Sequence, residues 1–129
     1  MALNIQIDAR DDGMTVVTLD GRLDTDTYLE LENRITPIFA TPPKVVVFDM
    51  TNLAYISSMG LRTIFKARKA IEAKKGKLVM TNLQPQIAKV IEIANALPKS
   101  SVFSSVEEAD RYFATMQRAE IEKQKKQGS

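Results

Sequence analysis

The sequence predicts a single α/β domain in which a mixed β-sheet of about four to five strands is packed against about four α-helices. Three observations lead to this fold class. Residues 4–10 and 14–19 alternate apolar and polar side chains on either side of a turn, which is typical of a hairpin. Residues 45–48 are consecutively apolar, as in a buried strand. Elsewhere apolar residues recur at helical spacing, so that strands and helices alternate along the 129-residue chain.

The first helix is expected after the hairpin. Gly21 allows the backbone to bend, and Thr27 with Glu30 has the spacing of a capping box. Pro37 and the prolines at 42 and 43 are expected to end the helix. Its apolar face consists of Tyr28, Leu31, Ile35 and Ile38.

The second half of the chain repeats the alternation. We expect a strand at 44–50, a helix at 61–71, a strand at 78–81, a helix at 85–97 and a short strand at 102–103. Ser105 and Glu108 form a second capping box, which opens a final helix through Val106, Ala109, Phe113 and Met116. Residues 1–116 therefore form the domain. Residues 117–129 are charged and rich in glutamine, and we expect them to be a frayed helix end or tail.

The composition excludes several kinds of chemistry. The chain has no cysteine and no histidine, which removes disulfides, thiolate zinc sites, the usual general base and the commonest metal ligand. Its 5 glycines fit no phosphate-binding or dinucleotide-binding spacing. No histidine is present to activate a serine as a nucleophile. We therefore predict a protein that is not an enzyme and that holds no metal and no cofactor.

Charge is distributed unevenly along the chain. Residues 1–61 carry 4 Lys and Arg against 9 Asp and Glu, whereas residues 62–129 carry 14 against 7. The aromatic side chains that would stack on a single-stranded nucleic acid are few, so this polarity favours a protein-binding surface and not nucleic acid. No apolar run is long enough to span a bilayer, and no signal pattern opens the chain, so we expect a cytoplasmic protein without membrane insertion.

The stretch most informative about function is Ser57-Ser58, which falls where the buried strand has ended and a basic amphipathic helix begins. A serine in this place can cap the helix by accepting hydrogen bonds from its first free N–H groups. It can also carry a phosphate, because those N–H groups and the helix dipole favour an anion. Position alone leaves both uses open and makes the cap the commoner one.

The residues around these serines are Ile56-Ser57-Ser58-Met59-Gly60-Leu61-Arg62, after an apolar strand ending in Asp49. This pattern resembles the anti-sigma factor antagonist family (STAS domains). Gly21-Arg22-Leu23-Asp24 matches the Gly-x-Leu-Asp element that this family has before its first helix. The resemblance runs from about residue 4 to about residue 116 and implies the family's fold. In that family the phosphoacceptor is the serine two positions before the glycine, which here is Ser58.

The chain departs from the family's pattern beside this serine. Well-known relatives have aspartate where this chain has Ser57, and a second serine where it has Met59. We interpret Ser57 as a cap or loop hydrogen-bonder and keep it as the alternative phosphoacceptor. The resemblance also implies a partner-binding surface around the loop, although Asp24 has an equally good alternative as a helix cap. The residues assigned to this surface are Asp24, Thr25, Asp26, Ser57, Ser58, Met59, Gly60 and Arg62.

The resemblance implies a partner switch. The unphosphorylated form would bind an anti-sigma factor that is itself a serine kinase, phosphorylation of Ser58 would block binding, and a metal-dependent serine phosphatase would restore it. ATP would then belong to the partner, and the free protein would be a monomer. The alternative is a constitutive STAS scaffold or subunit, for example in an ABC lipid-transport complex, with a structural serine. A third hypothesis keeps the switch but gives it an output other than a sigma factor.

Overall fold

The computed structural model describes residues 3–10, 12–41, 43–96 and 105–127. The described strands form one four-stranded sheet in the order β1-β2-β3-β4. β1 (Leu3–Ala9) pairs antiparallel with β2 (Met14–Leu23), whereas β2 pairs parallel with β3 (Val45–Ile56), and β3 parallel with β4 (Lys77–Thr81). The predicted mixed sheet of an α/β domain is therefore confirmed. The strand expected at 102–103 lies outside the described residues.

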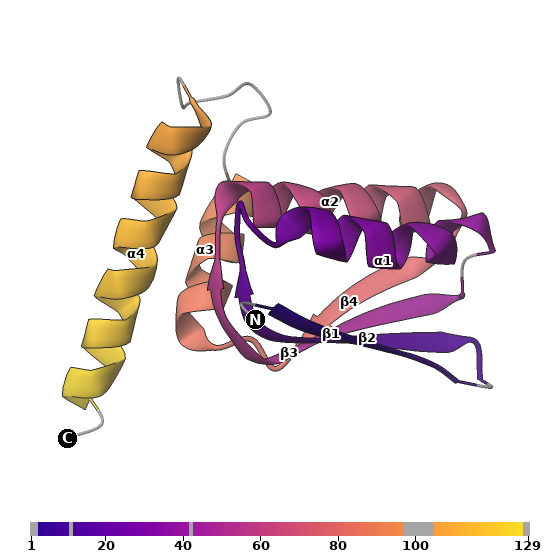
Figure 1. Ribbon diagram of the computed structural model, residues 1–129. Coiled ribbons are helices and arrows are strands. Elements are labelled where there is room, and N and C mark those ends of the chain that lie inside the picture. The colour runs from indigo at the N-terminus through magenta and orange to yellow at the C-terminus, as the bar shows by residue number, and fades with distance from the viewer. Residues whose placement is uncertain (1–2, 11, 42, 97–104, 128–129) are drawn as a thin grey trace.

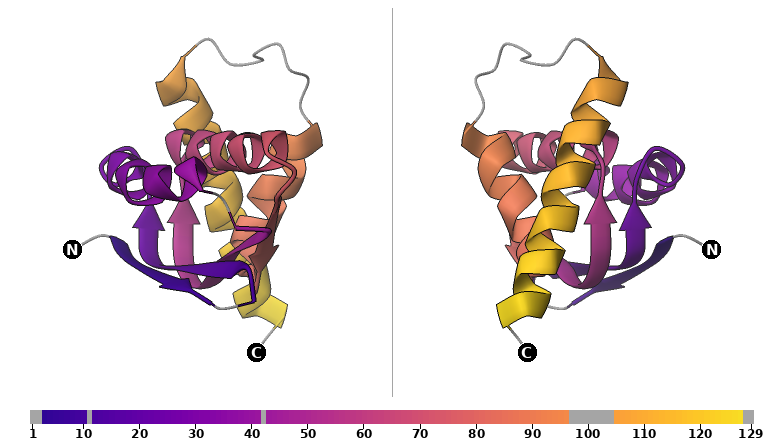
Figure 2. Two further views of the ribbon diagram at one scale, coloured as in Figure 1. Left: turned by 90° about the vertical axis from the view of Figure 1, so that its right-hand side faces the viewer. Right: turned by 90° about the vertical axis from the view of Figure 1, so that its left-hand side faces the viewer.

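Four helices are described, and they fall into two groups. α1 (Tyr28–Ala40) and α2 (Ser58–Ala73) connect the parallel strands and lie side by side over one face of the sheet (Figures 1 and 2). α3 (Pro85–Ala96) and α4 (Val106–Gln127) pack against each other at the end of the sheet where β3 leads into α2 (Figure 1). None of the described helices is both long enough and apolar enough to cross a membrane.

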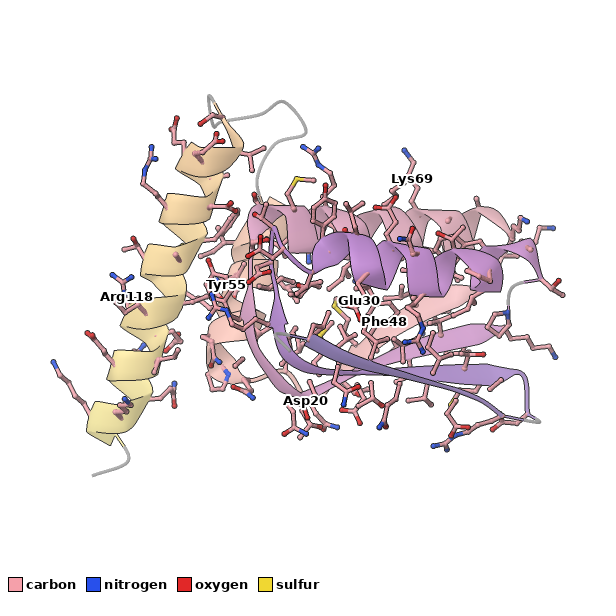
Figure 3. The ribbon with its side chains drawn as sticks, viewed as in Figure 1. Asp20, Glu30, Phe48, Tyr55, Lys69 and Arg118 are labelled. Carbon is pink, nitrogen blue, oxygen red and sulfur yellow. The ribbon has the colours of Figure 1, made fainter. Side chains whose placement is uncertain are left out.

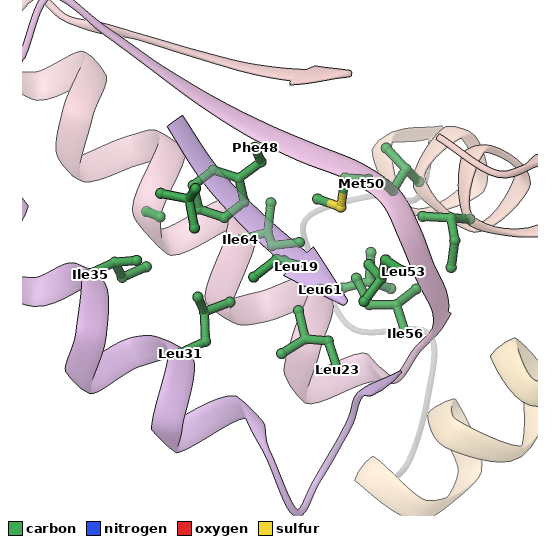
Figure 4. Packing of buried hydrophobic residues seen from close by; sticks show 14 of the residues in the cluster. Leu19, Leu23, Leu31, Ile35, Phe48, Met50, Leu53, Ile56, Leu61 and Ile64 are labelled. Carbon is green, nitrogen blue, oxygen red and sulfur yellow. The ribbon is translucent and has the colours of Figure 1, made fainter. Parts of the chain in front are cut away.

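The core lies between the sheet and the α1–α2 layer. Phe48 points from β3 toward the helices, whereas Asp20 points away from them on the other face (Figure 3). Burial alternates along β2 and β3 because successive side chains of a strand point to opposite faces. The close-up in Figure 4 shows side chains from two strands and two helices meeting there, among them Leu19, Leu31, Phe48 and Ile64.

β3 is longer than the sequence predicts. The expected strand ended at residue 50, but β3 continues to Ile56 in parallel register with β2, where Gly21 lies beside Leu53 and Leu23 beside Ile56. Leu53 and Ile56 are both fully buried, and this burial holds the extension against the core. The exposed polar pair Thr51 and Asn52 interrupts the apolar pattern, which is why the sequence suggested a loop.

α1 differs from expectation at its N-cap and at Pro37. The capping box does not form, because the Thr27 hydroxyl donates to the Arg22 carbonyl oxygen (2.8 Å) and the side chain makes no cap bond. Pro37 lies inside the helix, which continues to Ala40 and ends, as expected, before the prolines at 42 and 43.

α4 differs at its C-terminal end. Ser105 does cap it, since the Glu108 N–H donates to Ser105 Oγ (3.1 Å). However, the helix runs without a break through the boundary expected at 116 and ends at Gln127. Gln117, which the expected boundary placed after the domain, is 1% exposed and packs into it, whereas residues 118, 119 and 121–126 are exposed.

Candidate functional site: the N-terminus of helix α2

The site begins with the residue that joins β3 to α2. Ser57 is extended, is 2% exposed, and donates its N–H to the Leu23 carbonyl oxygen (2.9 Å). Its Oγ accepts a hydrogen bond from the Gly60 N–H (3.2 Å), so Ser57 is the N-cap of α2. The interpretation of Ser57 as a cap is confirmed: of the two serines, it is Ser57 and not Ser58 that caps α2.

Gly60 allows the first turn of α2 to lie directly on the end of β2. A Cβ atom at this position would stand 2.8 Å from both the Leu23 Cγ and the Leu23 carbonyl oxygen, which is closer than real Cβ contacts. Any side chain here would therefore push α2 away from the sheet. The close approach fixes the position of Ser58, two residues earlier on the same turn.

Ser58 is the first residue of α2, and its hydrogen bonds lead to a distant part of the chain. Both its N–H (2.9 Å) and its Oγ–H (2.7 Å) donate to Oδ1 of Asp110 on α4. α2 has no acidic residue in its own first turn, so the carboxylate at its N-terminus is supplied by another helix. An anion in this place is stabilised by the free N–H groups and by the helix dipole.

A second polar side chain holds α4 against the same segment. Gln117 Oε1 accepts from the Ile56 N–H (2.9 Å), and Gln117 Nε2 donates to the Ile56 carbonyl oxygen (2.7 Å). Nε2 also donates to the Phe113 carbonyl oxygen on α4 itself (3.1 Å). These bonds satisfy both backbone groups of the residue before Ser57, and they bring Asp110, about two helical turns earlier on α4, to Ser58.

Tyr55 lies beside this contact. Its ring projects from the end of β3 toward α4, where Arg118 also lies (Figure 3). The Arg22 guanidinium carbon stands 4.1 Å from the centre of the ring, within the range of a cation–π contact. Burial raises the pKa of the Tyr55 hydroxyl above its ordinary value of 10, and the Asp110 carboxylate raises it further, while Arg22 acts in the opposite direction.

The turn between β2 and α1 reaches the same place. Thr25 Oγ1 stands 3.4 Å from Asp110 Oδ2 in a long hydrogen bond. Asp24 Oδ1 accepts from the Asp26 N–H (3.0 Å), and Asp24 Oδ2 lies 3.5 Å from Arg22 Nε. Asp24 therefore stabilises the turn that leads into α1, while Thr27 occupies the N-cap position of that helix.

The remaining predicted residues of this surface lie on α2. Met59 is half-buried and Arg62 is exposed on the first turns of the helix. The structure thus brings the predicted positions of the β2–α1 turn together with the start of α2.

The sequence reasoning missed Asp110 and Gln117. Part of the signal was present, because Gln117 follows Phe113 by four residues and Ala109 by eight, on the buried face of α4. A glutamine on an apolar helix face needs buried hydrogen-bond partners, and this could have marked it. Nothing in the sequence placed Asp110 beside Ser58, since the contact spans 52 residues.

The described residues contain no cluster of three or more Asp and Glu side chains arranged to hold a metal ion. The chemistry available at the site is that of hydrogen bonding, of ion pairing and of a serine hydroxyl at a helix N-terminus.

Comparison with known proteins identifies the family. The model of the STAS domain matches residues 5–109, and the chain belongs to the STAS domain family. A putative anti-sigma factor antagonist, BtrV of Bordetella bronchiseptica, is 33% identical over 104 residues, which are 81% of this chain and 90% of that protein.

Solved structures show the same fold. That of an anti-sigma factor antagonist from Mycobacterium paratuberculosis has a TM-score of 0.63 and 20% identity, covering 83% of this chain and 90% of that one. The Bacillus cell fate determinant SpoIIAA in its phosphorylated form has a TM-score of 0.61 and 18% identity, covering 70% of this chain and 83% of that one.

Proposed function

We propose that this chain is an anti-sigma factor antagonist in a partner-switching pathway and that its unphosphorylated form binds an anti-sigma factor, thereby releasing the sigma factor. The relation to BtrV, a putative antagonist, supports the class. The single observation that carries the proposal is the position of Ser58. Its hydroxyl is half-buried at the N-terminus of α2, on a surface shared with the turn of Asp24 to Asp26.

Phosphorylation of Ser58 is proposed to block binding. A phosphate adds about −1.5 to −2 charges at neutral pH, and the N-terminus of a helix stabilises such an anion. The N-terminus of α2 therefore accommodates the modification, whereas a partner pressed against Met59 and Arg62 meets both its charge and its bulk. The anti-sigma factor would itself be the serine kinase and would hold ATP, and a metal-dependent phosphatase would reverse the reaction. This pathway places the protein in the cytoplasm.

A constitutive scaffold is the second candidate, and one observation favours it. The Ser58 hydroxyl already has a structural role, because it joins α2 to α4 through Asp110. A serine retained for that bond alone would need no kinase. A switch with an output other than a sigma factor has the same site chemistry as the first candidate and differs from it only in the partner.

The test measures the affinity of the full chain for its anti-sigma factor, captured from the native cells. The variants are Ser58→Ala and Ser58→Asp, with Ser105→Asp as a control that places the same charge at the start of another helix. We expect Ser58→Ala to bind at least as well as the natural chain. Ser58→Asp should weaken binding about tenfold, as for a charge facing a close interface, and Ser105→Asp should leave it unchanged. Wild-type affinity for Ser58→Asp would contradict the proposal.

A further inference from the structure

We propose that α4 is a phosphate-controlled element of this chain, whose N-terminal half is docked on α2 while Ser58 is unmodified and is displaced when Ser58 carries a phosphate. The inference rests on the proposed function in one respect, namely that Ser58 is the modified residue. It adds an intramolecular consequence of modification, and it assigns Asp110 as the residue that detects it.

A phosphate on Ser58 would take the place of the hydroxyl proton that now contacts Asp110. Ser58 Oγ and Asp110 Oδ1 are 2.7 Å apart, in direct hydrogen-bond contact. Phosphorylation replaces the proton that Asp110 accepts with a phosphoryl group. The hydrogen bond is then lost, and the added atoms occupy the place of the carboxylate. Either the phosphate must point elsewhere or Asp110 must move.

Movement of Asp110 is the favoured outcome, because both anions compete for the same N–H donors. Asp110 Oδ1 takes the Ser58 N–H (2.9 Å) at the N-terminus of α2, where no acidic residue of α2 competes with it. A phosphate attached to Ser58 has the larger charge and is covalently held at this N-terminus. Two such anions side by side repel each other, and the Asp110 carboxylate is the one displaced because the phosphate is covalently attached at this N-terminus.

The displacement is limited to part of α4. Gln117 is bound to both backbone groups of Ile56 and does not contact Ser58, so a phosphate leaves its hydrogen bonds intact. Before Gln117, α4 contacts α2 through Asp110, and Ala109 and Phe113 are buried; α4 as a whole also packs against α3. The half that begins at Val106 should therefore separate while the half beyond Gln117 stays. Such a movement exposes the apolar side of Phe113 only in the phosphorylated form.

The experiment measures hydrogen exchange of the isolated full chain, with phosphoserine installed at position 58 during translation so that no kinase or partner is needed. We expect amides of residues 106–113 to exchange about tenfold faster in the phosphorylated chain, the factor expected for a repulsive contact between partly solvated charges. Amides of residues 117–127 should be unaffected. Equal exchange of residues 106–113 in both forms would overturn the proposal.

A charge-matched pair of variants isolates Asp110. Asp110→Asn removes the charge that phosphate repels, whereas Glu107→Gln removes the same charge from an exposed position one turn earlier on α4. In the phosphorylated chain, Asp110→Asn should restore most of the protection of residues 106–113, and Glu107→Gln should restore none. Equal effects of the two variants would show that Asp110 does not detect the phosphate, and the proposal would fail.

A distance measurement gives an independent readout. The chain has no cysteine, so a pair of spin labels at Lys69→Cys on α2 and Glu107→Cys on α4 is unambiguous. Phosphoserine should lengthen and broaden this distance and leave the pair Lys69→Cys and Glu122→Cys unchanged. Unchanged distances for both pairs would overturn the movement. Because no partner is present, failure here is separable from failure of the partner switch, which the affinity of Ser58→Asp tests.

Discussion

The N-termini of α2 and α4 both have free N–H groups that an anion stabilises, but the two helices obtain that anion in different ways. Each follows a capping serine, Ser57 for α2 and Ser105 for α4. α4 carries its own acidic residues, Glu107 and Glu108, in its first turn and begins on an exposed surface. α2 has no acidic residue in its first turn and begins in a buried setting. The carboxylate at its N-terminus is that of Asp110 on α4.

The difference shows what makes an N-terminus suitable as a switch. The anion of α4 is part of its own helix and is always present. The anion of α2 comes from a separate element, so another anion on the neighbouring Ser58 can replace it. The same arrangement couples the conformation of α4 to the chemistry of one hydroxyl group.

The largest effect on stability is expected at Gln117, which anchors α4 and thereby positions the Asp110 carboxylate. Gln117→Ala would leave the N–H and the carbonyl of Ile56 without partners and open a cavity, at a cost of about 2–4 kcal/mol in the free energy of unfolding. Gln124→Ala, an exposed change on the same helix, should cost less than about 0.5 kcal/mol. Urea unfolding of both variants measures the difference. A similar stability for the two would mean that α4 is not anchored through Gln117.

A smaller difference in stability is expected between variants of the two capping serines. Ser57→Ala should cost about 1–2 kcal/mol because its partner, the Gly60 N–H, is buried against β2, whereas Ser105→Ala should cost about 0.5 kcal/mol because water replaces the exposed cap. Thermal unfolding at neutral pH compares them. Equal losses would show that burial does not separate the two helix ends.

The smallest effect is expected at alkaline pH. The pKa of Tyr55 is raised by burial first and by Asp110 next, so the folded chain keeps this proton at a pH where the unfolded chain has lost it. Stability must then fall as the pH rises above about 10, the ordinary pKa of tyrosine. Tyr55→Phe should remove this part of the loss and gain stability relative to the natural chain between pH 9 and pH 11, by about 1 kcal/mol or less. Parallel stability curves for the two would contradict the buried setting of Tyr55.

Much of the fold follows from local patterns. Alternation marks the hairpin, an apolar run marks β3, and helical spacing marks each helix, because these signals come from neighbouring residues. The errors fall where distant contacts decide. Past Asn52, β3 is held by its pairing with β2 and by the burial of Leu53 and Ile56, and Gln117 of α4 is held by Ile56.

The candidate site likewise has features that could be predicted from the sequence and one that could not. Ser57 as cap and the nearness of the β2–α1 turn to α2 were predictable, from capping chemistry and from the family pattern respectively. The Asp110 contact was not, since it depends on how α4 packs across the end of the sheet, and residue spacing carries no information about that packing.

Ser58 is proposed to be a phosphorylation switch. The most direct test is the intact mass of the protein isolated from its native cells, before and after phosphatase treatment, with peptide mapping of residues 57–62. We predict a single phosphatase-sensitive phosphate, located on Ser58 and not on the buried Ser57. Absence of phosphate under every growth condition would contradict the switch and leave Ser58 as the structural link between α2 and α4.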